Sequence, residues 1–324
     1  MKKILLLIHF LFMLLSSANA QSPQQALKSS QIVSFYNDAR YDSIWRLFSK
    51  NMQNNLPLDK TTQFFSGVNN YYGKIEQSAY AYEQAGLATF KITFTKGVMA
   101  LNFKLDNDDN ISAISVTRFI PGDLPQLERN TTKLILPFNG EWIIFWGGDT
   151  KEQNQHADVR AQKYAFDMLK VNEHGKSYKT DGKANEDYYA FGQAVIAPCD
   201  AEVVLAVDGV KDNKPGDQNP VYLPGNSVIL KTRNNEYMLL AHFKQHSVQV
   251  KEGDKVKQGQ LLGYCGNSGN SSEPHLHVHI QNVEDMNMAT GAKCYFDKII
   301  VNGVLKTDYS PVKNDKVGNV KLRK

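Results

Sequence analysis

Alternating histidine and aliphatic residues over 275–280 constrain the fold of this 324-residue chain more than any other feature. If the run His275-Leu276-His277-Val278-His279-Ile280 is a β-strand, its histidines share one face and its aliphatic side chains share the other. Three buried imidazoles are costly without polar partners. A metal centre would supply such a partner, because neutral imidazole is a preferred zinc ligand. The alternative is a solvent-exposed histidine stripe on an edge strand.

The residues before this run favour the metal centre. A loop of glycine, asparagine and serine over 266–271 leads into Pro274 and the histidine run, and Leu240-Ala241-His242-Phe243 presents a further histidine. Tight turns are expected at three glycines, namely Gly253, Gly259 and Gly263. Together these motifs resemble the lysostaphin/LytM-type zinc metallopeptidase family of peptidoglycan endopeptidases. The resemblance extends over residues 134–305.

The resemblance implies one zinc ion per chain, held by a His and an Asp early in the domain and by the second His of the H-x-H motif. The third ligand then falls on His277. The early pair is usually spaced H-x-x-x-D, but here ten residues separate His156 from Asp167, and position 160 is Arg. We expect His156 and Asp167 to be the ligands, with Asp158 as the competing candidate. Such a set leaves one open tetrahedral position, which is the catalytic pattern for zinc.

By the same resemblance, His242 and His275 correspond to the two active-site histidines that do not bind metal. One would take and return a proton, and the other would hydrogen-bond the oxyanion. We favour His275 as the base, but the sequence does not assign the two roles. His279 is either a partner that orients a metal ligand or a polar filler, and both interpretations stay open.

The N-terminus has the layout of a cleavable secretory signal over residues 1–20. Lys2 and Lys3 precede an apolar run over 4–15, and small residues end at Ala20. The apolar run is too short to cross the ~30 Å hydrocarbon core of a membrane. We therefore expect a bacterial protein that is periplasmic or secreted, with no transmembrane segment after signal cleavage.

The rest of the chain predicts two domains. Residues 24–120 begin with helical periodicity and continue with period-two alternation, which indicates an accessory α+β domain of helices on an antiparallel sheet. It resembles the nuclear-transport-factor-two-like accessory domains. A linker over 121–133 leads to a mostly-β antiparallel-sheet metallopeptidase domain over 134–305, and 306–324 are expected to be a basic C-terminal tail.

Charge and cysteine content narrow the function further. The formal charge of +4 falls to +2 when the signal, with two lysines and no acid, is removed. This small excess argues against a nucleic-acid partner. Cys199, Cys265 and Cys294 lack metal-site spacing, and their disulfide pairing is left open.

The function that we expect is hydrolysis of amide bonds in peptidoglycan peptides through a metal-activated water. The resemblance does not name the scissile bond. The alternatives are a non-catalytic LytM-like regulator of cell-wall amidases and a secreted protease acting on proteins. The N-terminal domain is expected to position substrate, to inhibit, or to bind a protein partner.

Overall fold

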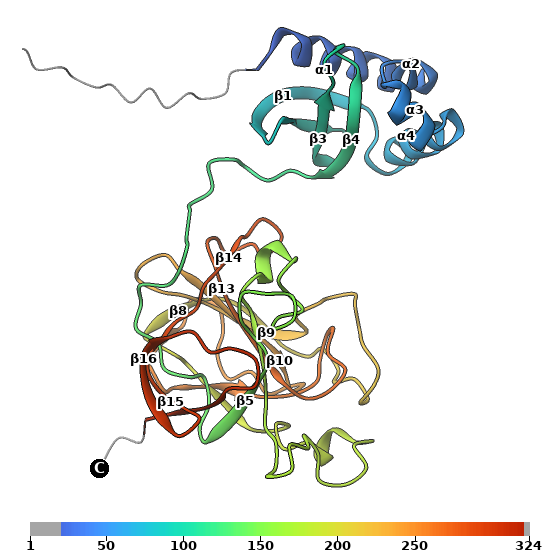
Figure 1. Cartoon of the computed structure of the whole chain (residues 1–324). Helices are drawn as coiled ribbons and strands as arrows, with labels where there is room; N and C mark the ends of the chain where they lie inside the picture. The colour runs from blue at the N-terminus through green and yellow to red at the C-terminus, as the bar shows by residue number, and fades with distance from the viewer. Residues whose placement is uncertain (1–20, 321–324) are drawn as a thin grey trace, which may run out of the picture. The chain divides into compact units, whose positions relative to one another are not determined.

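In the computed structural model, the structure describes residues 21–320 (Figure 1). The predicted signal segment, residues 1–20, lies outside the described residues. The chain divides between Asp123 and Leu124 into two compact units, which are described separately. This division falls inside the segment 121–133 that the sequence analysis treats as a linker. Over residues 21–320, no helix is long and apolar enough to cross a membrane.

The N-terminal unit begins with four helices: α1 (Pro23–Asn37), α2 (Tyr41–Arg46), α3 (Lys50–Asn55) and α4 (Leu58–Tyr72). Helix α1 starts at a capping box, in which Ser22 and Gln25 each accept a hydrogen bond from the other's backbone N–H. Tyr36 and Phe65, both buried, meet edge to face and join α1 to α4. These contacts place the helices around one aromatic core.

A four-stranded antiparallel sheet completes this unit, in the order β1-β2-β3-β4. Its strands are β1 (Ile75–Gln84), β2 (Leu87–Phe94), β3 (Gly97–Leu105) and β4 (Ile111–Arg118). Ala85 and Gly86 both have positive φ, as a two-residue hairpin turn between β1 and β2 requires. Figure 1 shows the helices beside the sheet, so the expected helices on an antiparallel sheet are present.

The C-terminal unit is dominated by an antiparallel sheet in the order β11-β8-β9-β10-β13-β6-β5-β17-β15-β16, with β14 paired to β13. A separate two-stranded sheet pairs β12 with β7. The strands are β5 (Glu141–Trp146), β6 (Phe166–Leu169), β7 (Ala194–Ile196), β8 (Ala201–Val207), β9 (Asn226–Lys231), β10 (Tyr237–Phe243), β11 (Lys255–Val256), β12 (Leu261–Tyr264), β13 (Leu276–Gln281), β14 (Gly291–Ala292), β15 (Phe296–Val301), β16 (Val304–Tyr309) and β17 (Lys316–Asn319). Two short 3₁₀ turns, η1 (Arg160–Gln162) and η2 (Asn185–Asp187), lie in its loops.

Strand β13 lies in the interior of the large sheet, between β10 and β6. Its aliphatic side chains, Leu276, Val278 and Ile280, belong to the hydrophobic core of the unit. Period two then places His277 and His279 on the opposite face. The exposed edge-strand alternative for the histidine stripe is wrong, because both histidines are buried.

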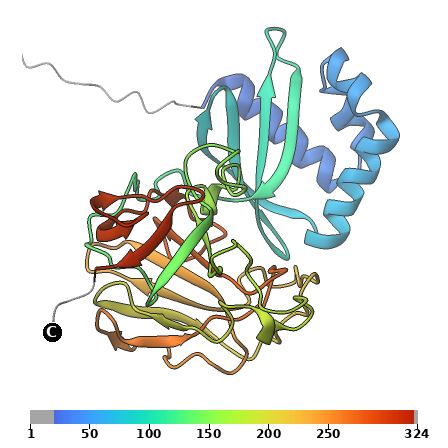
Figure 2. The ribbon, with the colours of Figure 1, turned by 60° about the horizontal axis from the view of Figure 1, so that its bottom comes forward.

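The expectation of a basic tail over residues 306–324 is wrong for its described part. Residues 306–309 continue β16, and β17 pairs with both β15 and β5 (Figure 2). Lys306 on β16 and Lys316 on β17 are exposed, so the described part of this segment has a basic composition although it is paired into the sheet. Val317 is fully buried between its neighbours and anchors β17 in the sheet.

The cysteines of the C-terminal unit do not form a disulfide. Cys199, Cys265 and Cys294 are all free and buried. Burial raises the pKa of the Cys199 thiol to about 12, which keeps it protonated and unreactive at neutral pH.

Candidate metal centre and active site

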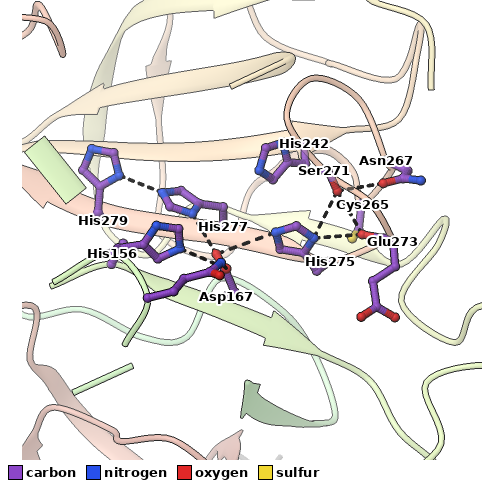
Figure 3. A network of polar contacts seen from close by, with 12 residues as sticks. His156, Asp167, His242, Cys265, Asn267, Ser271, Glu273, His275, His277 and His279 are labelled. Carbon is purple, nitrogen blue, oxygen red and sulfur yellow. Dashed lines mark hydrogen bonds and ion pairs between the residues drawn. The ribbon is translucent and has the colours of Figure 1, made fainter. Parts of the chain in front are cut away.

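Three of the side chains that the sequence nominates as ligands lie together on one face of the large sheet. The ligand atoms of His156, Asp167 and His277 are all within 4.8 Å of one another. His156 Nε2 is 2.9 Å from Asp167 Oδ2, and His277 Nδ1 is 2.8 Å from Asp167 Oδ1 (Figure 3). Two imidazoles and one carboxylate are a donor set that suits zinc.

Strand register accounts for two members of this set. Asp167 on β6 and His277 on β13 are direct cross-strand partners, so their side chains share a face. His156 comes from the loop between β5 and β6, which folds back toward Asp167. Buried Asn154 holds this loop: its side chain donates to Gly148 O and Ala165 O and accepts from the backbone N–H of His156. The long spacing between His156 and Asp167 therefore does not keep them apart.

The competing candidate does not join the cluster. The Asp158 carboxylate is 69% exposed and pairs with Lys151 at 2.6 Å. Gln155, for which the sequence predicts no role, instead donates to Asp167 Oδ2 at 3.2 Å.

His242 and His275 line the same site from the other side. Their ring centroids are 4.7 Å apart, and the His242 centroid is 5.8 Å from that of His277. His242 lies in β10 at a register shift between Ala241 and Phe243, with φ +65°. A bulge of this kind re-aims a side chain at the cost of local backbone strain. His275 immediately precedes β13.

Backbone carbonyls select the same tautomer for both of these rings. The Nδ1 of His242 is 2.7 Å from Ser268 O, and the Nδ1 of His275 is 2.8 Å from Glu273 O. A carbonyl accepts only, so each Nδ1 carries a proton and donates it. Each neutral ring then keeps its lone pair on Nε2, and His275 Nε2 lies 3.6 Å from Asp167 Oδ1.

The buried charge of Asp167 dominates the electrostatics of the cluster. Burial alone raises the pKa of this carboxyl, but the charge of His275 and hydrogen bonds from His156, His275 and His277 outweigh it and hold the pKa well below the usual range. Burial lowers the pKa of His275, whereas the Asp167 charge and hydrogen bonds raise it above its usual value overall. Burial, followed by the charges of His275 and His277, lowers the pKa of His242.

The cluster opens into a groove of about 650 Å³. Its wall is formed by residues of the segments 150–190 and 210–225, such as Val159 and Leu223, and by the loop over 270–273. One part of the lining is apolar, with Phe145, Trp146, Val159, Leu169, Leu239 and Met286. Among the described lining residues there is no Lys or Arg, and the acids are Asp167 and Glu273. The lining of the groove thus combines an apolar part with the polar and acidic side chains of the cluster.

Two family models match parts of the chain. Residues 186–289 match the model described as Peptidase family M23, which includes His242, His275 and His277 but not His156 or Asp167. Residues 29–114 match a model described as Protein of unknown function (DUF3887). The expected likeness to nuclear-transport-factor-two-like domains therefore stays a prediction.

Two curated relatives come from Vibrio cholerae serotype O1 (strain ATCC 39315 / El Tor Inaba N16961). Peptidoglycan DD-endopeptidase ShyA is 34% identical over 73 residues, 19% of this chain and 17% of the relative. Peptidoglycan DD-endopeptidase ShyC is 33% identical over 86 residues, 26% of this chain and 18% of the relative. The matched segments thus span less than a fifth of these relatives. Within the C-terminal unit, residues 186–289 are thus similar to peptidase family M23.

Solved structures are also similar to this chain. Lysostaphin from Staphylococcus simulans is 23% identical with a TM-score of 0.27, covering 40% of this chain and 41% of that one. A zinc containing peptidase from Vibrio cholerae is 13% identical with a TM-score of 0.25, covering 74% of this chain and 93% of that one.

Proposed function

We propose that this chain is an exported zinc endopeptidase that hydrolyses amide bonds in peptidoglycan peptides. The observation that carries the proposal is the clustering of His156, Asp167 and His277 in a groove that His242 and His275 also line. The similarity to peptidase family M23 and to two peptidoglycan DD-endopeptidases supports the reaction class and the substrate. The signal-like residues 1–20 support export to the compartment where peptidoglycan lies.

The donor set fits a zinc ion. His156 Nε2, one Asp167 oxygen and His277 Nδ1 would hold it, and three protein ligands leave a position for substrate or water. When bound, zinc would act as a Lewis acid that polarises a carbonyl and lowers the pKa of water toward ~7. Asp167 is 5% exposed and would bring the negative charge that a buried dication needs.

The chain's own residues would then accept and donate the protons of the reaction. Because carbonyls hold Nδ1–H of both His242 and His275, the Nε2 lone pair of either neutral ring is available to accept a proton from the attacking water. The same ring would return that proton to the leaving amine. The other ring, once protonated at Nε2, would donate to the oxyanion of the tetrahedral intermediate.

The choice of base stays a prediction, with His275 favoured. The high pKa of His275 in this structure depends on the negative charge of Asp167. A zinc ion bound to Asp167 would offset that attraction, so the protonation of the metal-free site does not decide between His242 and His275.

The test is digestion of purified sacculi by the wild type, His277→Ala, His275→Ala and the control His174→Ala. His174 has an exposed ring, so its replacement removes a histidine without touching the groove. Solubilisation by the wild type and the control alone is expected, with mass spectrometry of the released fragments naming the bond. Zinc content is measured on the same samples.

Each other outcome has a defined meaning. Zinc near one per chain without digestion of sacculi would redirect the search to protein substrates. Absence of both zinc and digestion would overturn the enzyme proposal in favour of a non-catalytic regulator of amidases.

A further inference from the structure

One short loop supplies the carbonyls that hold the two histidines outside the metal-ligand set. The loop over residues 268–273 lies between β12 and β13 and contributes to the wall of the groove. Ser268 O, at its start, is 2.7 Å from His242 Nδ1, and Glu273 O, at its end, is 2.8 Å from His275 Nδ1. The placement of both rings therefore depends on the conformation of this loop.

A second loop, over residues 212–225, is hydrogen-bonded to the loop over 268–273. Residues of both loops line the groove. Backbone hydrogen bonds of 2.8 to 2.9 Å join them: Gly216 N–H donates to Ser272 O, Asn219 N–H donates to Gly269 O, and Asn270 N–H donates to Leu223 O. The conformation of one loop therefore constrains that of the other.

Asn213 belongs to the second loop, and its side-chain amide reaches the middle of the loop over 268–273. Its Nδ2 donates to Gly269 O at 2.7 Å and to Ser271 O at 2.9 Å, which uses both hydrogens of the amide. Because peptide groups are planar, holding these two carbonyls fixes two of the peptide planes between Ser268 and Glu273. The remaining carbonyls of the loop are then limited in how far they can turn.

Asn213 is itself held by side chains of its neighbours. Its carbonyl accepts from Asn185 Nδ2 at 2.8 Å and from Asn267 Nδ2 at 3.3 Å. Asn267 is fully buried, and its Oδ1 accepts from Ser271 Oγ at 2.7 Å (Figure 3). Buried amides with these partners have few alternative arrangements, so the contact between the two loops is specified by side chains as well as by backbone.

We infer that Asn213 is a positioning residue, which fixes the loop over 268–273 so that its carbonyls hold His242 and His275 beside the metal cluster. Asn213 acts through the loop and takes no part in the chemistry itself. The inference goes beyond the proposed function, on which it rests for the reaction that is measured.

The candidate metal ligands should not depend on Asn213. Asp167 and His277 lie on the paired strands β6 and β13, and His156 is held by the buried side chain of Asn154. Loss of the Asn213 amide should therefore slow the reaction and leave zinc binding unchanged.

Two substitutions remove the bridge in different ways. Asn213→Ala removes the amide, and Asn213→Asp keeps its shape but has no N–H to donate. The matched control is Asn319 on β17, outside the described lining of the groove, whose Nδ2 donates to Leu136 O at 3.0 Å and to Phe138 O at 2.8 Å. Both asparagines are partly buried, so Asn319→Ala and Asn319→Asp each lose two hydrogen bonds of the same kind.

The first measurement is kcat, KM and zinc affinity on soluble cross-linked muropeptides, with the full chain. The kcat is expected to fall roughly 10- to 100-fold in both Asn213 variants, with KM and zinc affinity unchanged, and to stay at the wild-type value in the Asn319 variants. A raised KM with unchanged kcat would mean that the loops only bind substrate, and would overturn the inference. Equal kcat values for the Asn213 and Asn319 variants, or loss of zinc from the Asn213 variants, would overturn it as well.

The second measurement does not use activity. Hydrogen exchange of the Asn270 amide, which donates from one loop to the other, is followed by NMR in the zinc-free full chain. Exchange is expected to be about 10-fold faster or more in the Asn213 variants and unchanged in the Asn319 variants. Unchanged exchange in either folded Asn213 variant would overturn the inference. A wild type that does not hydrolyse muropeptides would instead refute the proposed function, and the exchange rates would still show whether Asn213 holds the loop.

Discussion

Burial of His279 makes the stability of the zinc-free protein depend on pH. Burial, followed by the charge of His277, lowers its pKa from 6.5 to about 3 in the folded chain. Between these pH values the unfolded chain binds the proton more readily than the folded chain does. Folding stability therefore rises with pH across this window, and the contribution of His279 is complete above pH 6.5 and lost as pH falls toward 3.

The magnitude follows from the width of the window. Each pKa unit corresponds to about 1.4 kcal/mol, so a shift from 6.5 to about 3 corresponds to roughly 5 kcal/mol at most. At pH 5.0, about 1.5 units below the unfolded pKa, the wild type should have lost about 2 kcal/mol from this group alone. His279→Gln carries no titrating ring at this position, so its free energy of unfolding should not fall by this amount.

The assay is urea unfolding with EDTA at pH 7.5 and pH 5.0, monitored by tryptophan fluorescence. Trp45→Phe in every protein leaves Trp142 and Trp146 as the tryptophans, so the signal reports the C-terminal unit. His174→Gln, at an exposed ring, is the control for removal of a histidine. Equal losses of unfolding free energy in the wild type and in His279→Gln would refute the reasoning.

Two further predictions concern the metal and a loop. Zinc at about 1,000 times its Kd should add roughly 4 kcal/mol to the free energy of unfolding, which would raise the Tm of the C-terminal unit by roughly 8–16 °C. Calorimetry should find no such rise in His277→Ala, and a rise there would contradict the ligand assignment. A Cβ on Gly225, at φ +61°, would lie 2.4 Å from the carbonyl carbon of Ser268, whose oxygen holds His242, whereas a Cβ on Gly216, at φ +93°, meets nothing within 4 Å. Both alanine variants carry a left-handed backbone cost of ~1–2 kcal/mol. The kcat on sacculi should nevertheless fall roughly 10- to 100-fold in Gly225→Ala alone. Equal kcat values for the two variants would count against the role of Ser268.

The histidine stripe could be predicted from sequence because period two fixes the face of every side chain once a strand is assumed. The same alternation continues to Gln281, so the pattern also predicts the face of this buried side chain, whose Oε1 lies 2.9 Å from His279 Nε2. The carbonyls of Ser268 and Glu273 could not be predicted as hydrogen-bond acceptors for the histidines, because backbone groups of loops carry no residue-type signal.

Two other features depended on tertiary structure. The approach of His156 to Asp167 relies on the hydrogen bonds of Asn154 to carbonyls on both sides of the loop, which spacing alone cannot express. The sequence of 306–319 predicts a tail because it is mostly polar, whereas its order comes from the pairing of β16 with β15 and of β17 with β15 and β5. These strands have a weak sequence pattern, because Val317 is the buried residue of β17 and β16 has none.

At His242, the residue that best suits the backbone conformation differs from the residue that the proposed chemistry needs. Its φ of +65° is a conformation that glycine or asparagine adopts more readily than histidine does. Selection for thermal stability alone should therefore replace this histidine, and selection for hydrolysis should restore it. In a library selected for both properties, the residue found at position 242 would show which selection was the stronger.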